Sequence, residues 1–90
     1  MIRHANITIQ GQVQGVSFRE NTRKKAKSLS LKGYVKNLED GSVFIEAEGE
    51  ERDVKKFIIW CHMGPELSKV DKTRFEFNKD FKYFREFTVE

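Results

Sequence analysis

Residues 11 to 19 read Gly11-Gln12-Val13-Gln14-Gly15-Val16-Ser17-Phe18-Arg19, a short polar turn that two glycines bracket. Glycine lets backbone N–H groups approach a ligand that a Cβ would keep away. Successive N–H groups in a turn that opens a helix form an anion nest, and an adjacent arginine adds a planar fork of donors suited to phosphate. The stretch therefore predicts a small phosphate site at a strand-to-helix turn. From the spacing alone, an ordinary turn with a solvated arginine is the alternative.

The segments that flank this turn differ in their hydrophobic period. Before the turn, residues 4–11 alternate between apolar and polar side chains, which is typical of a half-buried strand. After the turn, side chains at a spacing near 3.6 residues predict an amphipathic helix. The stripe of that helix comprises Phe18, Thr22, Ala26 and Leu29.

Four further strands and a second helix are expected along the remaining chain. The strands are Gly33 to Asn37, Ser42 to Glu48, Val70 to Asn78 and Tyr83 to Val89, and an Asp40-Gly41 turn joins the first two as a hairpin. A helical stripe precedes the stop signal Gly64-Pro65 and comprises Val54, Phe57, Ile58 and Cys61. This order predicts an α+β protein with a ferredoxin-like split βαβ sandwich. Its antiparallel sheet of four to five strands should carry two helices on one face.

Length and composition limit the classes of protein that this chain can form. Its 90 residues predict a single domain over residues 1–90, and 38% hydrophobic content with 12% aromatic residues suits a folded globule. A net charge of +3 favours small anions but is far below the charge density of a dedicated nucleic-acid binder. A single cysteine and the lack of a leader-like or membrane-length apolar stretch predict a soluble, cytoplasmic protein. No coiled coil or exposed apolar stripe is apparent, so a monomer is expected.

A second motif coincides with the strand that follows the first predicted helix. It reads Gly33-Tyr34-Val35-Lys36-Asn37, followed by Gly41, Val43 and Gly49. In a ferredoxin-like sheet this strand can lie near the first one, so Asn37 could face the loop that carries Arg19. An asparagine offers an acceptor and two donors, and it can orient a water without adding charge. The alternative is a plain turn asparagine at the start of a hairpin.

Together, the two motifs resemble the signatures of the acylphosphatase family, in order and at the right separation. The resemblance spans nearly the whole chain and implies hydrolysis of the carboxyl–phosphate bond of an acyl phosphate to a carboxylate and inorganic phosphate. By the family's pattern, Arg19 binds the phosphate and Asn37 positions the attacking water, without a cofactor, a metal ion or a covalent phosphoenzyme. A phosphate or sulfate ion would bind in the loop formed by Gln14, Gly15, Val16, Ser17, Phe18 and Arg19.

Two further positions bear on this expectation. Thr22 lies one helical turn after Arg19, where its hydroxyl could either support the site or bond to its own backbone. Ser30 departs from the family's pattern, which usually has a glycine at this place, so we expect strain where the first helix ends. A metal site is not expected, because Cys61 and His62 are adjacent on a helix and point in different directions.

Two other functions stay open at this point. A non-catalytic domain that binds or carries phosphate compounds would use the same fold, since similar domains occur in large hydrogenase-maturation proteins that handle carbamoyl phosphate. The segment Lys32-Gly33-Tyr34-Val35 resembles the start of an RNA-recognition motif, but Lys36 to Glu39 lacks the aromatic positions that stack bases. We therefore expect a small-molecule acyl phosphate as the partner, and neither nucleic acid nor a membrane.

Overall fold

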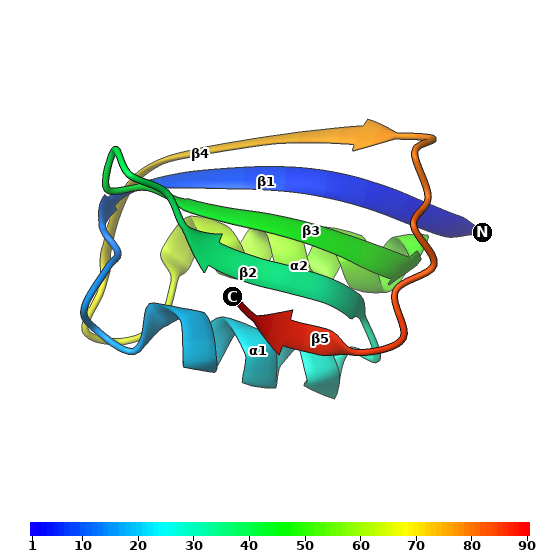
Figure 1. The fold of residues 1–90 in the computed structure, drawn as a ribbon, viewed down its shortest axis with the longest axis horizontal. Helices are drawn as coiled ribbons and strands as arrows, with labels where there is room; N and C mark the ends of the chain where they lie inside the picture. Colours follow the sequence, from blue (N-terminus) through cyan, green and yellow to red (C-terminus); the bar gives the residue numbers. More distant parts are fainter.

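The structure is a computed structural model that describes all 90 residues, and its strands form one five-stranded sheet (Figure 1). The strands are β1 (Ile2–Gln12), β2 (Lys32–Asn37), β3 (Val43–Glu50), β4 (Lys69–Asn78) and β5 (Phe87–Val89). They lie in the order β4-β1-β3-β2-β5. Neighbours from β4 to β2 pair antiparallel, whereas β5 pairs parallel with β2. The predicted antiparallel pairing is confirmed for four strands, and the fifth strand makes the sheet mixed.

The direction of β5 follows from where the chain crosses to the far edge of the sheet. After β4 the chain descends along one end of the molecule, the end at which β2 also begins (Figure 1). A strand that enters the far edge from this end runs in the same direction as β2. The strand predicted from Tyr83 to Val89 is also shorter than expected, because Tyr83 has a φ of 55°, outside the extended region. We call the connecting residues 79–86 the strap.

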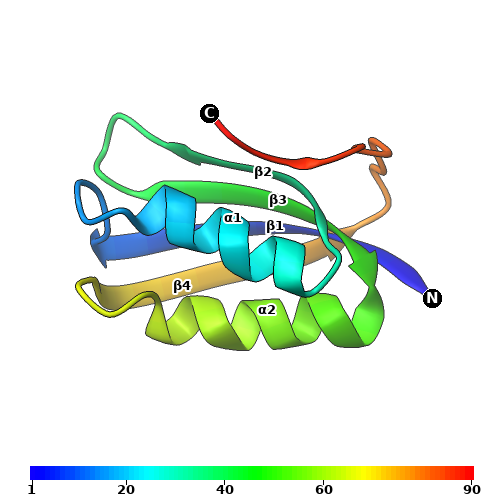
Figure 2. The ribbon, with the colours of Figure 1, turned by 90° about the horizontal axis from the view of Figure 1, so that it is seen from below.

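Two helices, α1 (Phe18–Ser28) and α2 (Glu51–Met63), cover one face of the sheet, as the sequence predicts (Figure 2). The inward side chains of the strands and the apolar stripes of the helices meet there. Cys61 lies among them, and burial raises the pKa of its thiol. The buried core consists of 16 residues: Ala5, Ile7, Ile9, Val13, Phe18, Ala26, Leu31, Val35, Val43, Ile45, Ala47, Val54, Phe57, Ile58, Cys61 and Phe87.

The end of α1 contains the strained residue that the sequence predicts. Ser30 has a φ of 59°, in the left-handed region. The N–H of Ser30 donates to the Lys27 carbonyl at 3.0 Å, and the N–H of Leu31 donates to the Ala26 carbonyl at 2.9 Å. This is the Schellman pattern, in which glycine is the usual left-handed residue. The helix therefore ends with the hydrogen bonds of a glycine-capped helix, although the side chain of Ser30 disfavours the left-handed conformation.

The sheet face opposite the helices carries a buried charged cluster. His4 lies between two glutamates, with Nδ1 2.6 Å from Glu48 Oε2 and Nε2 2.9 Å from Glu46 Oε1. Nε2 also forms a hydrogen bond with Asn6 Oδ1 at 3.1 Å, so both ring nitrogens have polar partners. Glu48 also accepts hydrogen bonds from the strap, from the N–H of Lys82 at 2.6 Å and of Phe84 at 3.2 Å. The cluster therefore fixes the strap across this face of the sheet.

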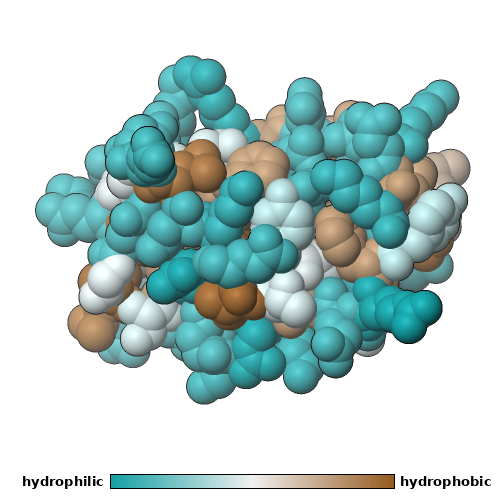
Figure 3. Space-filling view, in the orientation of Figure 1, coloured by the Kyte–Doolittle hydropathy of each residue, from teal (hydrophilic) through white to brown (hydrophobic).

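Charged side chains dominate the surface around these elements. In the view of Figure 3, hydrophilic residues cover most of the visible face, and apolar residues appear as separate patches. This agrees with a charged content of 34%. Neither helix is both long enough and apolar enough to cross a membrane.

Candidate functional site

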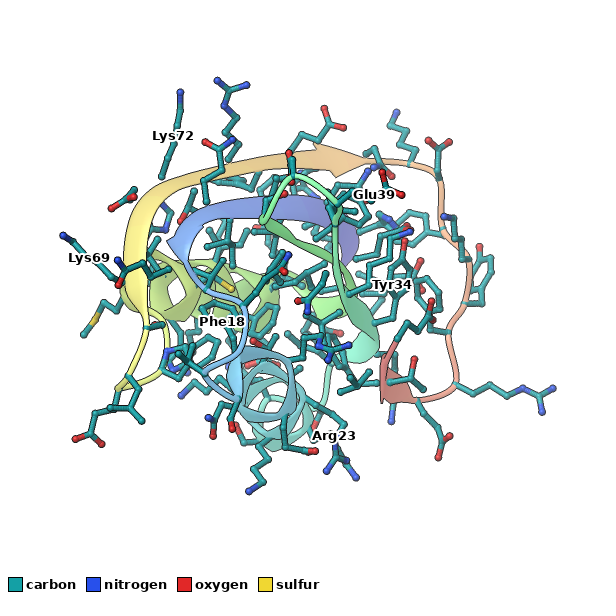
Figure 4. The ribbon with its side chains drawn as sticks, turned by 60° about the vertical axis from the view of Figure 1, so that its left-hand side comes forward. Phe18, Arg23, Tyr34, Glu39, Lys69 and Lys72 are labelled. Atoms are coloured by element: carbon teal, nitrogen blue, oxygen red, sulfur yellow. The ribbon has the colours of Figure 1, made fainter.

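The connection from β1 to α1, the turn from β2 to β3 and the end of β5 border one small hollow. Figure 4 brings this side of the molecule forward, with Phe18 at the start of α1 and Glu39 on the β2–β3 turn. The hollow has a volume of about 180 Å³. Its lining residues are Gly15, Ser17, Phe18, Arg19, Glu20, Asn37 and Val89. The structure thus brings Arg19 and Asn37 together, although 17 residues lie between them in the sequence.

The loop before α1 presents a series of free backbone donors. Gly15 has a φ of 77° and Ser17 a φ of 58°, and these left-handed residues turn the chain sharply into the helix. The N–H groups of residues 14–20 donate to no acceptor within the chain, and the first helical N–H with such a partner is that of Asn21, which donates to Ser17. Free N–H groups at a helix start, next to turned backbone, are what a bound anion satisfies.

Arg19 lies at the edge of this hollow with one donor already engaged. Its Nη1 donates to the main-chain oxygen of Glu90 at 2.8 Å. Glu90 is itself held by a hydrogen bond from its N–H to the Val35 carbonyl at 2.9 Å. A guanidinium has five donors, so most of them remain for a ligand. The contact with Glu90 spans 71 positions of sequence, and no motif near Arg19 signals it.

Asn37 ends β2, lines the same hollow and carries an unsatisfied polar atom. Its Oδ1 is buried and has no hydrogen-bond partner. A buried polar atom without a partner is rare in folded proteins, because it loses its water without replacing it. A water or ligand donor in the hollow would supply the missing hydrogen bond.

Gln14 joins the two halves of the site through its side chain. Its Nε2 donates to the Leu38 carbonyl at 2.9 Å and to the Ser42 carbonyl at 2.8 Å. Both acceptors belong to the turn that follows Asn37, so the loop before α1 is connected to the end of β2. The sequence predicts Gln14 as part of the phosphate loop but gives no sign of this second role.

Two local contacts set the charge around the hollow. Glu20 lines it, and Arg23 donates to the Glu20 carboxylate through Nε at 2.6 Å, which lowers the pKa of Glu20. Asp40 shapes the β2–β3 turn by accepting from the Ser42 N–H at 2.9 Å, and the bonds from Ser42 lower the pKa of Asp40. Because Arg23 balances Glu20, the charge of Arg19 is not neutralised by a carboxylate side chain within the hollow.

The other predicted site residues lie close by but do different things. The Thr22 hydroxyl donates to the Phe18 carbonyl at 2.8 Å, so it bonds to its own helix, and Thr22 does not line the hollow. Val16 packs against the core, and Phe18 is a buried core residue at the first position of α1. No group of three or more His, Cys, Asp or Glu side chains is arranged to hold a metal ion.

Comparison with known proteins identifies the family to which this fold and site belong. The sequence model of the acylphosphatase family matches residues 5–89. An acylphosphatase of Thermotoga maritima is 46% identical over 85 residues, covering 87% of this chain and 94% of that protein. An acylphosphatase of Marinobacter nauticus is 46% identical over 71 residues, covering 79% of this chain and 77% of that protein. The chain belongs to the acylphosphatase family.

Solved structures agree with this family. The acylphosphatase from Coxiella burnetii has a TM-score of 0.93 and 37% sequence identity, covering 99% of this chain and 93% of that one. The acylphosphatase from Bacillus subtilis has a TM-score of 0.94 and 32% identity, covering 100% and 99%. A larger protein, HypF, solved in a phosphate- and nucleotide-bound form, matches this chain with a TM-score of 0.87 and 32% identity over 12% of its length.

Proposed function

We propose that this chain hydrolyses the carboxyl–phosphate bond of acyl phosphates, with Arg19 and the loop amides binding the phosphate and Asn37 orienting the water. The observation that carries the proposal is one small hollow lined by Arg19, by loop residues with free N–H groups and by Asn37, whose Oδ1 has no hydrogen-bond partner. Membership of the acylphosphatase family supports the same reaction.

Phosphate binding follows from the donors of the hollow. The N–H groups of Gly15 to Arg19 converge on a phosphoryl group, and the free donors of Arg19 form charge-assisted hydrogen bonds to its oxygens. Each such bond contributes about 1.5–3 kcal/mol. Phosphoryl transfer depends mainly on positioning and on stabilising charge, which this arrangement supplies.

The attacking water is held by Asn37. The Asn37 Oδ1 accepts a hydrogen bond from the water and so directs the oxygen of the water at phosphorus. As the new P–O bond forms, the bond between phosphorus and the acyl oxygen breaks, and the carboxylate leaves with the electron pair. No side chain of the hollow is an evident general base, since Glu20 is paired with Arg23. A phosphate oxygen of the substrate therefore accepts the proton of the water.

Single substitutions test the two roles. We expect Arg19→Ala to lower kcat/KM for acetyl phosphate by about 10³-fold or more. Asn37→Ala should lower kcat by about 10²-fold, with a smaller effect on KM, because it removes an orienting group and not the phosphate site. Arg52→Ala is the matched control, since Arg52 is exposed on α2 and forms no ion pair. Near-normal turnover of either site variant would contradict its role.

The reaction as proposed needs no metal ion. A carboxylate is a good leaving group, and the charge of the phosphoryl group is met by Arg19 and by backbone donors. Hydrolysis of acetyl phosphate should proceed at the same rate with and without an excess of a chelator. A rate that vanishes with chelator would overturn the metal-free proposal.

A second candidate is a domain that binds or carries phosphate compounds without hydrolysing them. The observation behind this alternative is the match to a small part of HypF, a larger protein that was solved in a phosphate- and nucleotide-bound form. Turnover discriminates the two, because a carrier binds an acyl phosphate in a stoichiometric amount and releases no phosphate. As further proposals, we place the protein in the cytoplasm, because its single cysteine is buried and requires no oxidising compartment. We also expect a monomer, because the sequence contains no coiled coil and no apolar stripe suited to an interface. Sedimentation equilibrium tests the oligomeric state.

A further inference from the structure

A larger groove lies beside the phosphate hollow, and the two share Gly15 and Ser17. The groove has a volume of about 800 Å³ and opens between the start of α1 and the loop that follows α2. Its remaining lining residues are Val16, Asn21, Lys24, Lys25, Trp60, Pro65, Glu66 and Leu67. A group attached to a phosphate in the hollow can therefore extend past Gly15 and Ser17 into this groove.

The side chains of the groove favour an anion. Lys24 and Lys25 both line it, and neither forms an ion pair within the chain. Glu66 is the one acidic lining residue, so the groove has an excess of positive charge. Nothing in the proposed hydrolysis of the acyl–phosphate bond uses these two lysines.

Trp60 gives the groove a flat apolar wall of fixed orientation. Its ring stacks on Phe57, with centroids 6.1 Å apart and planes at 10°, and it contacts the Phe18 ring at a centroid distance of 6.4 Å. Because two core rings hold it, the indole can meet a planar group without losing side-chain freedom on binding.

We propose that this groove binds the acyl half of the substrate and selects acyl phosphates whose acyl group carries a negative charge. The inference rests on the proposed function, because it assumes that the phosphate occupies the hollow beside Arg19. The lysines attract the distant anionic group, and the Trp60 wall accommodates the part of the acyl group that joins this anion to the phosphate.

Two rigid substrates of the same shape test the proposal. 4-Carboxybenzoyl phosphate carries a negative charge opposite the acyl phosphate, and 4-methylbenzoyl phosphate carries a methyl group in its place. We expect kcat/KM to be about fivefold higher for the carboxylate, which is about 1 kcal/mol and typical of exposed charge pairs. The preference should shrink in 1 M salt, where such interactions are screened.

Variants show whether the groove is responsible for the preference. In the double variant Lys24→Gln with Lys25→Gln, the ratio of the two kcat/KM values should fall to about one. Lys72→Gln is the control, since Lys72 is exposed on β4 and points away from the molecule (Figure 4), and it should keep the native ratio. Equal kcat/KM values in the native protein, or a preference that survives in the double variant, would overturn the proposal.

Acetyl phosphate separates this inference from the function on which it rests. If the native protein hydrolyses acetyl phosphate but shows no preference for the carboxylate, the inference fails and the proposed function stands. If the protein hydrolyses none of the three compounds, the proposed function fails and the inference fails with it.

Discussion

Gln14 is the residue through which the phosphate loop and the Asn37 hairpin depend on each other. Its amide donates to the Leu38 and Ser42 carbonyls, so Gln14→Ala removes the two side-chain hydrogen bonds that connect the loop before α1 to the β2–β3 turn. We expect kcat/KM for an acyl phosphate to fall by about 10²-fold, because a shift of about 1 Å between catalytic groups has an effect of that size. Gln10→Ala, at an exposed position of β1, is the control for steady-state kinetics. An unchanged kcat/KM in Gln14→Ala would show that the loop keeps its place without this link.

Ser30 is a residue whose own conformation opposes folding. A residue other than glycine in the left-handed region costs about 1–2 kcal/mol. Ser30→Gly removes this cost, but part of the gain in stability is offset, since glycine makes the unfolded chain more flexible. We expect Ser30→Gly to raise the free energy of unfolding by about 0.5–1 kcal/mol in urea denaturation. Ser28→Gly is the same change at the last residue of α1, where the backbone is helical, and it should lower the free energy of unfolding by a similar amount. A loss of stability in both variants would contradict the strain at Ser30.

At the scale of single residues, the sequence predicts the residues of the hollow that belong to its motifs and misses those that come from distant segments. Arg19 and Asn37 each occur in a local motif, and the predicted ferredoxin-like sheet is the reason to expect Asn37 near the loop that carries Arg19; the structure places both residues on one hollow. Val89, the last residue of β5, also lines the hollow, and Glu90, which follows it, accepts a hydrogen bond from Arg19 across 71 positions. Such a contact depends on the edge that β5 joins, which local residue types do not encode.

At the scale of elements, the strap owes its position to ionised carboxylates. Burial favours a raised pKa for Glu48, but hydrogen bonds from the strap N–H groups and from His4 outweigh it and lower the pKa below the ordinary value of 4.5. For Glu46, burial is likewise outweighed, by hydrogen bonds from Tyr34 and Lys82. Carboxylates with lowered pKa values stabilise the fold above their unfolded pKa, and they lose this effect as the pH falls through the folded value.

This linkage predicts that the free energy of unfolding decreases as the pH falls below about 4.5. Glu48→Gln removes one of the two groups, so the slope of stability against pH in this range should become smaller. Urea denaturation at several pH values measures the slope. Glu76→Gln, on exposed β4 and without an ion pair, should keep the native slope. If Glu48→Gln has the same slope of stability against pH as the native protein, Glu48 does not contribute to the loss of stability in acid.

The sequence does not predict a segment correctly where contacts with distant segments, and not the segment's own hydrophobic pattern, determine its structure. His4, Glu46 and Glu48 follow the polar alternation expected of a solvated sheet face, yet the strap buries them. The strap in turn breaks the predicted last strand at Tyr83, because its N–H groups bond to Glu48 and not to a neighbouring strand. By contrast, the hydrophobic period of each helix lies within the helix itself, and both helices are confirmed.

At the scale of the whole molecule, the hollow that we propose for phosphate joins segments from both ends of the chain. Its lining comes from the loop before α1, the end of β2 and the end of β5. These segments approach one another only in the folded protein, so an anion that bridges them binds the native state and not the unfolded chain. Ligand binding of this kind stabilises the whole fold through mass action.

Inorganic phosphate should therefore raise the midpoint of thermal unfolding. At about ten times its Kd, phosphate adds ~1.4 kcal/mol of stability. In a chain of this size, each ~1 kcal/mol raises the midpoint by about 4–8 °C. Arg19→Ala should lose most of the shift because it removes the charged donor, and Arg52→Ala should retain it. Differential scanning calorimetry at constant ionic strength, with chloride as the reference anion, separates specific binding from screening. If the midpoint of thermal unfolding shifts equally in chloride and in phosphate, or equally in Arg19→Ala and in the native protein, phosphate does not bind in this hollow.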